Sequence, residues 1–189
     1  MQILFGGAFN PPTIAHYEII KYLLEKFEDA QIILLPTNQY YHKNDLAPFQ
    51  DRFNMLDILC QKLNSKRVTI SDYEAKLDKY YGTYYILKAF NHPYFVIGAD
   101  SLKNIDKWIK YPDIVIENKF IVFPRDNINI KGIMENNPIL KKYNNNFIIL
   151  ENFRKLNISS TMFRKDKENK YLLEEVAQYI KENNLYEVK

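Results

Sequence analysis

Short apolar stretches recur along the chain and alternate with longer amphipathic ones. Each apolar stretch is too short for a helix, is rich in Ile, Val and Phe, and has no polar face. This composition is typical of a strand buried inside a parallel sheet. The pattern predicts six strands, at residues 2–5, 31–35, 67–71, 94–98, 119–123 and 146–150.

The amphipathic stretches between them show helical spacing. In the first, Ile19, Leu23 and Phe27 recur at every fourth position, so they share one face of a helix. A proline at the start of the second, Pro48, suits the first turn of a helix. The pattern predicts helices at residues 14–27, 48–63, 83–90 and 173–184.

Strands that alternate with helices favour an α/β fold. We predict a Rossmann-like, doubly wound, six-stranded parallel sheet in the common order 3-2-1-4-5-6, with helices on both faces. The length of 189 residues suits a single domain over residues 1–189, in which residues 158–189 form a C-terminal helical segment.

Composition narrows the class of protein. The net charge is only +3, from 26 Lys and Arg against 23 Asp and Glu, which does not favour a nucleic-acid partner. The single cysteine, Cys60, excludes an internal disulfide and a cysteine-based zinc site. No apolar stretch approaches the roughly 20 residues that a membrane span needs. We expect a cytoplasmic protein without a nucleic-acid or membrane partner, and homo-oligomer formation stays open.

The predicted strand order points to a ligand site. In doubly wound sheets, ligands bind at the carboxyl ends of the strands where the order reverses, here between the first and fourth strands. The first strand is followed by "GGAFN" (6–10), and the fourth ends in "GADS" (98–101). Two glycine-bearing turns are therefore expected to flank one crevice.

The stretch "GGAFNPPTIAH" (6–16) has the features of a phosphate-binding turn. Gly6 and Gly7 are expected to let the backbone turn tightly and approach a ligand. Thr13 can cap the next helix, and His16 lies in its first turn, where unpaired amides attract phosphate. Each residue taken singly also fits an ordinary helix start. Neither a dinucleotide fingerprint nor a Walker A loop is present.

Residues 13–16, "TIAH", resemble the (H/T)-x-G-H signature of nucleotidyltransferases, with Ala15 in place of the glycine. Further motifs occur in the order found in bacterial nicotinate-nucleotide adenylyltransferases, and the resemblance spans nearly the whole chain. They are "LPTNQYYHK" (35–43), "GADSLKNIDKW" (98–108), "FPR" (123–125), "ISSTMFR" (158–164) and "VAQYIKENNLY" (176–186). The resemblance implies that the protein joins nicotinate mononucleotide and ATP to give deamido-NAD and pyrophosphate. It also implies a requirement for Mg²⁺, which would be held mainly by substrate phosphates.

The resemblance also implies roles for residues at the ATP. His16, Thr13 and Arg164 would be catalytic. Ser159 would cap a helix whose first amides face the triphosphate, and Asp100 would bond a ribose hydroxyl. An ordinary capped helix is the alternative at both places. The implied ATP-binding residues are Gly7, Ala8, Phe9, His16, Gly98, Asp100, Ile158, Ser159, Thr161 and Arg164.

A second set would bind the mononucleotide. Trp108 would stack on the cationic pyridine ring, and amides at Thr83 would hold the nicotinate carboxylate. Core packing of Trp108 and a plain polar turn after the second strand are the alternatives. The implied mononucleotide-binding residues are Asn38, His42, Lys43, Thr83, Trp108 and Arg125.

Three other functions stay open. A phosphopantetheine adenylyltransferase also favours Thr at position 13, but it lacks the tryptophan segment and the C-terminal tail. A nicotinamide mononucleotide adenylyltransferase would differ only in how the pyridine substituent is bound. A non-catalytic nucleotide sensor would not need both anion sites. The chain departs from the nicotinate family's usual residues at Thr13, Ala15, Tyr40, Tyr41 and Gly82.

Overall fold

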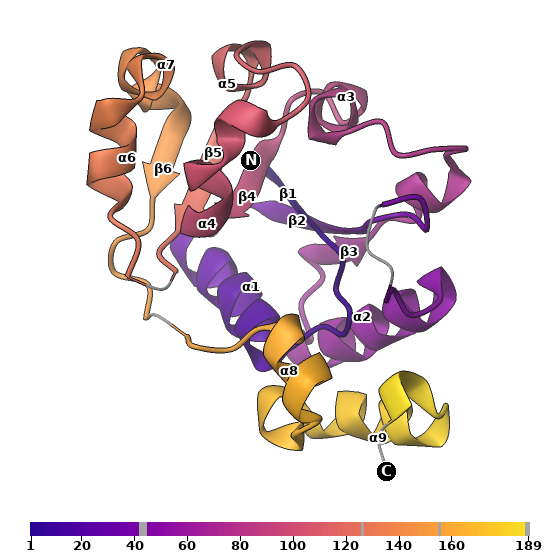
Figure 1. Ribbon diagram of the computed structural model, residues 1–189. Helices are drawn as coiled ribbons and strands as arrows, with labels where there is room; N and C mark the ends of the chain where they lie inside the picture. Colours follow the sequence, from indigo (N-terminus) through magenta and orange to yellow (C-terminus); the bar gives the residue numbers. More distant parts are fainter. Residues whose placement is uncertain (42–44, 126, 155, 188–189) are drawn as a thin grey trace. The chain divides into compact units, whose positions relative to one another are not determined.

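Six strands form one sheet in the order β3-β2-β1-β4-β5-β6 (Figure 1). The computed structural model describes residues 1–41, 45–125, 127–154 and 156–187. All six predicted strands and their predicted order are confirmed. The strands are β1 (Gln2–Gly7), β2 (Gln31–Pro36), β3 (Val68–Ile70), β4 (Tyr94–Gly98), β5 (Lys119–Phe123) and β6 (Phe147–Ile149).

The strands pair in parallel and are buried on both faces. β4 pairs with both β1 and β5, and β5 pairs with β6. In β5, Phe120, Ile121 and Val122 have no exposed surface. The Phe120 ring stacks on Phe147 of β6 at 5.1 Å between centroids. A strand covered on both faces needs apolar residues at every position, which is why these stretches show no polar alternation.

The helices follow the predicted alternation. The four predicted helices correspond to α1, α2, α3 and α9, with Pro48 at the N-cap of α2 rather than inside its first turn. The α-helices are α1 (Ile14–Lys26), α2 (Phe49–Leu63), α3 (Thr83–Ala89), α4 (Ala99–Lys103), α5 (Asp113–Glu117), α6 (Ile130–Asn136), α7 (Pro138–Lys142), α8 (Ser160–Asp166) and α9 (Glu174–Glu182). The 3₁₀-helices are η1 (Tyr73–Lys76), η2 (Ile105–Lys107), η3 (Asn144–Asn146), η4 (Asn169–Tyr171) and η5 (Leu185–Glu187).

The chain forms two compact units. The first comprises Met1, Gly6–Tyr80 and Ile158–Lys189, and the second comprises Gln2–Phe5 and Tyr81–Asn157. β1 therefore begins in the second unit and ends in the first. The prediction of a single domain over residues 1–189 stays a prediction.

The C-terminal segment completes the core of the first unit. α8 and α9 lie beside α2 (Figure 1). Apolar side chains from α8, from α9 and from the η4 segment between them form one buried cluster with α2, made of Met55, Phe163, Tyr171, Leu172, Val176 and Ile180. Burial of this apolar area holds the segment in place, so residues from 158 onward are part of this core rather than an appendage.

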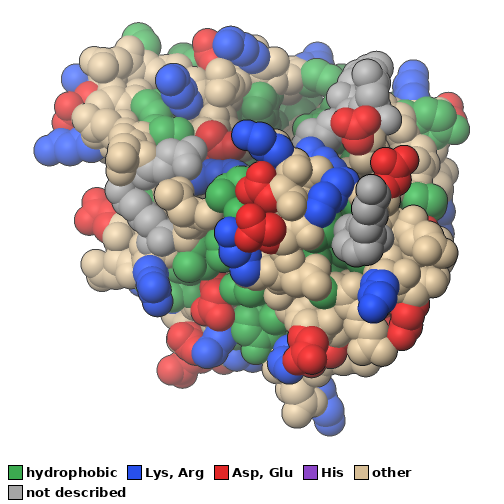
Figure 2. All heavy atoms as spheres, turned by 60° about the horizontal axis from the view of Figure 1, so that its bottom comes forward, with side chains coloured by type: hydrophobic (Ala, Val, Ile, Leu, Met, Phe, Trp, Pro, Cys, Tyr) green, Lys and Arg blue, Asp and Glu red, His purple; other side chains and the backbone are tan. Residues whose placement is uncertain are grey.

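No helix in the described part of the chain is long and apolar enough to cross a membrane. On the face that Figure 2 turns forward, Lys and Arg side chains are interspersed with Asp and Glu. This mixture agrees with the small net charge of +3.

Candidate nucleotide-binding site

The loop after β1 turns at Phe9, not at the two glycines. Gly6 and Gly7 belong to β1, and neither has a positive φ. A Cβ atom at Gly7 would lie 3.5 Å from the Phe9 ring, which is an ordinary contact distance. Phe9 itself has a φ of 45° and is buried. The expectation that Gly6 and Gly7 make the turn is therefore wrong. The buried Phe9 ring anchors a left-handed turn that its residue type would not favour.

The start of α1 brings Thr13 and His16 together. Thr13 is the N-cap residue, as predicted, and its backbone N–H donates to Nδ1 of His16 at 2.9 Å. The half-buried His16 ring also lies 5.1 Å from the Phe9 ring. Because Nδ1 accepts a hydrogen bond, a neutral His16 carries its proton on Nε2. The imidazole therefore presents Nε2 as a donor, which suits an anionic ligand.

α8 is bonded directly to the loop after β1. Ser159 caps α8, as predicted, by accepting a hydrogen bond from the Met162 N–H at 3.2 Å. Ser160 Oγ donates to the Pro11 carbonyl at 2.8 Å, and Arg164 Nη1 donates to the Asn10 carbonyl at 2.8 Å. The exposed Thr161 lies on the same helix, and its Oγ1 is 3.5 Å from Arg164 Nη2.

Within the first unit, two segments that were predicted to bind ATP thus lie together, the start of α1 and α8. The α1 segment with His16 contacts Phe9, and the α8 segment with Ser160 and Arg164 bonds the carbonyls of Pro11 and Asn10, so both segments meet the loop that follows Gly7. The predicted meeting of Asp100 with this group stays a prediction, because Asp100 belongs to the second unit.

Asn10 connects the loop after β1 to the rest of the first unit. Its side chain is 2% exposed. Oδ1 accepts from the Tyr186 hydroxyl at 2.7 Å and from the Ala47 N–H at 3.0 Å. Nδ2 donates to the Asp45 carbonyl at 2.7 Å. Burial raises the pKa of the Tyr186 phenol, so the hydroxyl stays protonated and acts as the donor. Sequence reasoning missed both Asn10 and Tyr186.

Arg52 is a third residue that sequence reasoning missed. It has no exposed surface, and its guanidinium donates to three backbone carbonyls, those of Ala8, Thr37 and Ala47. Burial lowers the pKa of Arg52. A signal was present in the sequence. Arg52 shares the buried face of α2 with Met55, Leu56 and Leu59, a face on which a charged residue is unusual.

The loop after β2 is fixed by internal bonds. Asn38 is 2% exposed, and its amide Nδ2 donates to the Lys79 carbonyl at 2.9 Å. Asn38 Oδ1 accepts from the Tyr40 N–H at 3.1 Å, so both ends of the side chain are bonded within the protein. Its mononucleotide contact stays a prediction. His42 and Lys43 lie outside the described residues.

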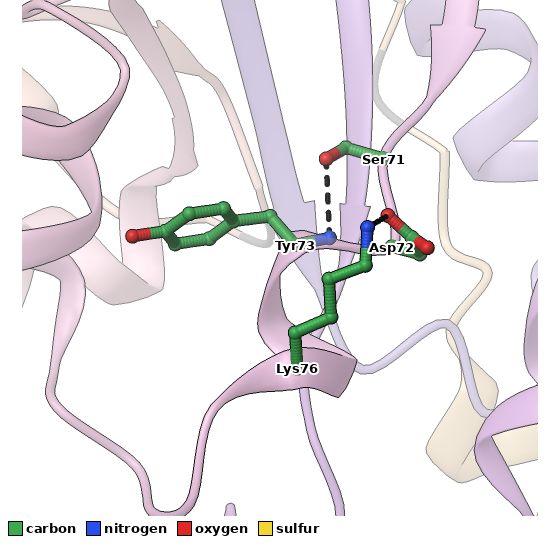
Figure 3. Close-up of polar contacts among 4 residues, drawn as sticks. All are labelled: Ser71, Asp72, Tyr73 and Lys76. Atoms are coloured by element: carbon green, nitrogen blue, oxygen red, sulfur yellow. Dashed lines mark hydrogen bonds and ion pairs between the residues drawn. The ribbon is translucent and has the colours of Figure 1, made fainter.

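Glu74 supports this loop from η1. The 3₁₀-helix begins where Ser71 Oγ accepts from the Tyr73 N–H at 3.2 Å, and Lys76 pairs with Asp72 at 2.8 Å (Figure 3). Glu74 is buried, and its Oε2 accepts from the Asn38 N–H at 3.1 Å. Burial raises the pKa of the Glu74 carboxyl to about 7.

In the second unit, Asp100 and Arg125 lie side by side. Asp100 Oδ2 is 3.6 Å from Arg125 Nη1, and Oδ1 has no hydrogen-bond partner among the described residues. A Cβ atom at Gly98 would lie 2.4 Å from Oδ1, so only glycine leaves room for this carboxylate position. Gly98 occupies the N-cap of α4, so Asp100 is not the cap that we considered as the alternative. A partly exposed ion pair contributes little to stability, so Asp100 and Arg125 can each separate from the other and bind a ligand instead.

Trp108 and Thr83 also belong to the second unit. Trp108 is half-buried, with its ring edge-on to Phe95 at 6.3 Å between centroids. Thr83 opens α3, as predicted, after Gly82 with a φ of 91°. A Cβ atom at Gly82 would lie 2.7 Å from Ile109 Cδ1. The departure from the family's usual residue at Gly82 thus has a structural basis: Ile109 fills the space and the φ favours glycine.

Comparisons with known proteins agree with this fold and with the predicted family. A family model described as cytidylyltransferase-like matches residues 4–166, which places the chain among the nucleotidyltransferases. A protein of Acholeplasma laidlawii named "Probable nicotinate-nucleotide adenylyltransferase" is 34% identical over 99% of this chain and 98% of its own length. A protein of the same name from Clostridium acetobutylicum is 34% identical over 98% of both chains.

The chain therefore belongs to the family of nicotinate-nucleotide adenylyltransferases, and the family predicted from its motifs is confirmed. A solved structure of nicotinic acid mononucleotide adenylyltransferase from Plasmodium falciparum, complexed with NaAD, superposes with a TM-score of 0.82. That alignment covers 100% of this chain and 98% of the other at 23% identity, and it confirms the α/β fold.

Proposed function

We propose that this protein transfers the adenylyl group of ATP to nicotinate mononucleotide, giving deamido-NAD and pyrophosphate in NAD biosynthesis. The observation that carries the proposal is the junction of His16 and Arg164 around the loop after β1. There Arg164 bonds the Asn10 carbonyl, and His16 closes the first turn of α1. A cation and a histidine donor at a helix start form a site for a polyphosphate.

The proposed reaction needs alignment and charge neutralisation more than proton transfer. A phosphate oxygen of the mononucleotide forms a bond to the α-phosphorus of ATP, and the bond from that phosphorus to the pyrophosphate oxygen breaks. The attacking phosphate monoester has a second pKa of about 6 and is largely ionised at neutral pH. No general base is required, and His16 and Arg164 would stabilise negative charge on the triphosphate during transfer.

The other roles follow the family resemblance. Asp100 would bond the ATP ribose, and Arg125 would bond the mononucleotide phosphate together with Lys43. Trp108 would stack on the pyridine ring, and amides near Thr83 would bind its carboxylate. The stacking role is supported by the half-buried state of Trp108, since the residue keeps exposed surface while its ring lies edge-on to Phe95.

The proposal includes Mg²⁺ and a cytoplasmic location. Among the described residues, no group of three or more His, Cys, Asp or Glu is placed to hold a metal ion. Magnesium commonly binds through substrate phosphates and water with few protein ligands, so the ion would travel with the triphosphate. The lone Cys60 suits a reducing compartment.

The test is magnesium-dependent release of pyrophosphate from ATP, measured in parallel with nicotinate mononucleotide, nicotinamide mononucleotide and phosphopantetheine. The proposal expects the highest kcat/KM with nicotinate mononucleotide. A preference for either of the other acceptors would assign a different adenylyltransferase reaction. ATP binding without turnover on any acceptor would indicate a nucleotide sensor instead.

A further inference from the structure

We infer that Arg52 is a positioning residue that aligns the two substrate-binding loops for adenylyl transfer. The inference rests on the proposed function, and it concerns a buried side chain that would touch neither substrate. All the contacts that carry it lie within the first unit.

The guanidinium of Arg52 bridges the ends of two neighbouring strands. Nη1 donates to the Ala8 carbonyl at 2.8 Å, just after β1, and Nη2 donates to the Thr37 carbonyl at 2.8 Å, just after β2. The two loops leave the sheet together, because the Thr37 N–H donates to the Gly7 carbonyl at 2.9 Å. Nε donates to the Ala47 carbonyl at 3.0 Å, where the chain enters α2. One rigid, planar group thus sets the spacing of both loops.

These bonds also fix which way the two peptide groups face. In a trans peptide the N–H points opposite to the carbonyl. At Thr37, the carbonyl bonds Arg52, and the N–H of the same peptide, on Asn38, donates to Glu74 at 3.1 Å. At Ala8, the carbonyl bonds Arg52, so the Phe9 N–H is directed away from the guanidinium. Arg52 therefore orients the backbone of the loop proposed to meet ATP.

Arginine is suited to this role because its three hydrogen bonds all go to backbone carbonyls. Burial lowers the pKa of Arg52, while the charge of Glu74 acts to raise that pKa and so favours the charged form. No carboxylate forms an ion pair with Arg52 among the described residues, and the guanidinium lies 5.5 Å from the Phe49 ring. Charge-assisted bonds to carbonyls are stronger than neutral ones. A lysine at this position keeps the charge but not the planar fork, so it cannot hold the two carbonyls at the same spacing.

Spacing between the loops matters for the transfer step. The loop after β1 is proposed to bind ATP, and the loop after β2 is proposed to bind the mononucleotide. The reacting atoms must approach to roughly 3–3.5 Å in line, and a misplacement of about 1 Å can cost on the order of 10²-fold in rate. A residue that sets the loop spacing should therefore act on kcat more than on the KM of either substrate.

The chain offers a matched control in Arg67. Like Arg52, it donates to three backbone carbonyls, those of Leu24, Phe27 and Glu28, but these lie at the C-terminal end of α1. The variants R52K and R67K are compared for thermal unfolding and for steady-state kinetics with both substrates. R52K is expected to lower kcat on the order of 10- to 100-fold, with each KM changed less than about threefold. R67K is expected to keep kcat within about twofold of wild type, whatever its loss of Tm.

The outcomes separate the inference from the proposed function. If the kcat of R52K equals that of R67K, Arg52 serves stability only and the inference is overturned. Wild-type protein without turnover overturns the proposed function alone. In that case, hydrogen exchange still tests the alignment, because R52K should speed exchange of residues 8–10 and 37–38 relative to R67K. Unchanged exchange there overturns the inference. If R52K does not fold, R52Q replaces it in both measurements.

Discussion

Replacing Tyr186 by Phe removes one hydroxyl group from the bonds around Asn10. The Tyr186 hydroxyl donates to Asn10 Oδ1 at 2.7 Å, across 176 positions of sequence. The ring itself packs edge-on to Phe163 at 5.7 Å between centroids, and phenylalanine retains that contact. The substitution therefore isolates a single hydrogen bond between the C-terminal segment and the loop after β1.

The loss of stability in Y186F depends on the hydrogen bonds that Asn10 keeps. Oδ1 still accepts from the Ala47 N–H at 3.0 Å, so no buried acceptor is left without a partner. The loss is then the net value of one neutral hydrogen bond, about 1 kcal/mol. For a protein of this length, that loss lowers Tm by about 2–4 °C.

Thermal unfolding followed by circular dichroism measures this shift, with Y171F as the matched control. The Tyr171 hydroxyl donates at 2.9 Å to Asp166, whose carboxylate is exposed. Water can replace the phenol at that carboxylate, so Y171F should lower Tm by less than Y186F. A Y186F protein with Tm within about 1 °C of wild type, or a larger drop in Y171F, would refute the reasoning.

Four further predictions concern the site. Replacing His16 by Ala should lower kcat on the order of 10²–10³-fold through loss of one transition-state donor; near-wild-type kcat would remove it from the catalytic group. W108A should raise the KM for nicotinate mononucleotide and leave ATP affinity unchanged in calorimetry; the reverse pattern would place the pyridine ring elsewhere. G98A should weaken ATP binding, because its Cβ would displace the Asp100 carboxylate; equal affinity would contradict that role. The pKa of Glu74 is raised to about 7, so Glu74 binds a proton more tightly in the folded protein and its ionisation costs stability as pH rises from about 4.5 to 7. The free energy of unfolding of E74Q, measured in urea, should therefore rise relative to that of wild type as pH increases from about 5 to 8. A difference between the two proteins that does not change with pH would refute this.

The sheet could be predicted from sequence because its signal is local. A buried parallel strand needs apolar residues at each position, and β5 shows this in every residue after Lys119. The short helices α4, α5 and α6 were missed because their five to seven residues show no clear helical period.

The positions of two helix caps could be predicted from the motifs, whereas residues that act through tertiary contacts were missed. Thr13 and Ser159 occupy the helix caps that their residue types indicate. The turn at Phe9 depends on the burial of its ring. The two adjacent glycines before it, Gly6 and Gly7, are the residue type usual in a turn, so the turn was predicted at the wrong residues. Tyr186 acts through a partner that is far away along the chain, so its role has no local sequence pattern. For Arg52 the sequence shows only a charged residue on the apolar face of α2, and not the loops whose carbonyls it binds.

No single cut in the chain releases either compact unit whole, because β1 contributes residues to both. A polypeptide restricted to residues 81–157 would lack the β1 segment that pairs with β4 through Ile3–Tyr94 and Leu4–Phe95. One side of β4 would then present unpaired backbone amides and carbonyls beside Phe95 and Val96. Such a fragment should self-associate through that open edge, and adding a peptide with the sequence of β1 should suppress the association.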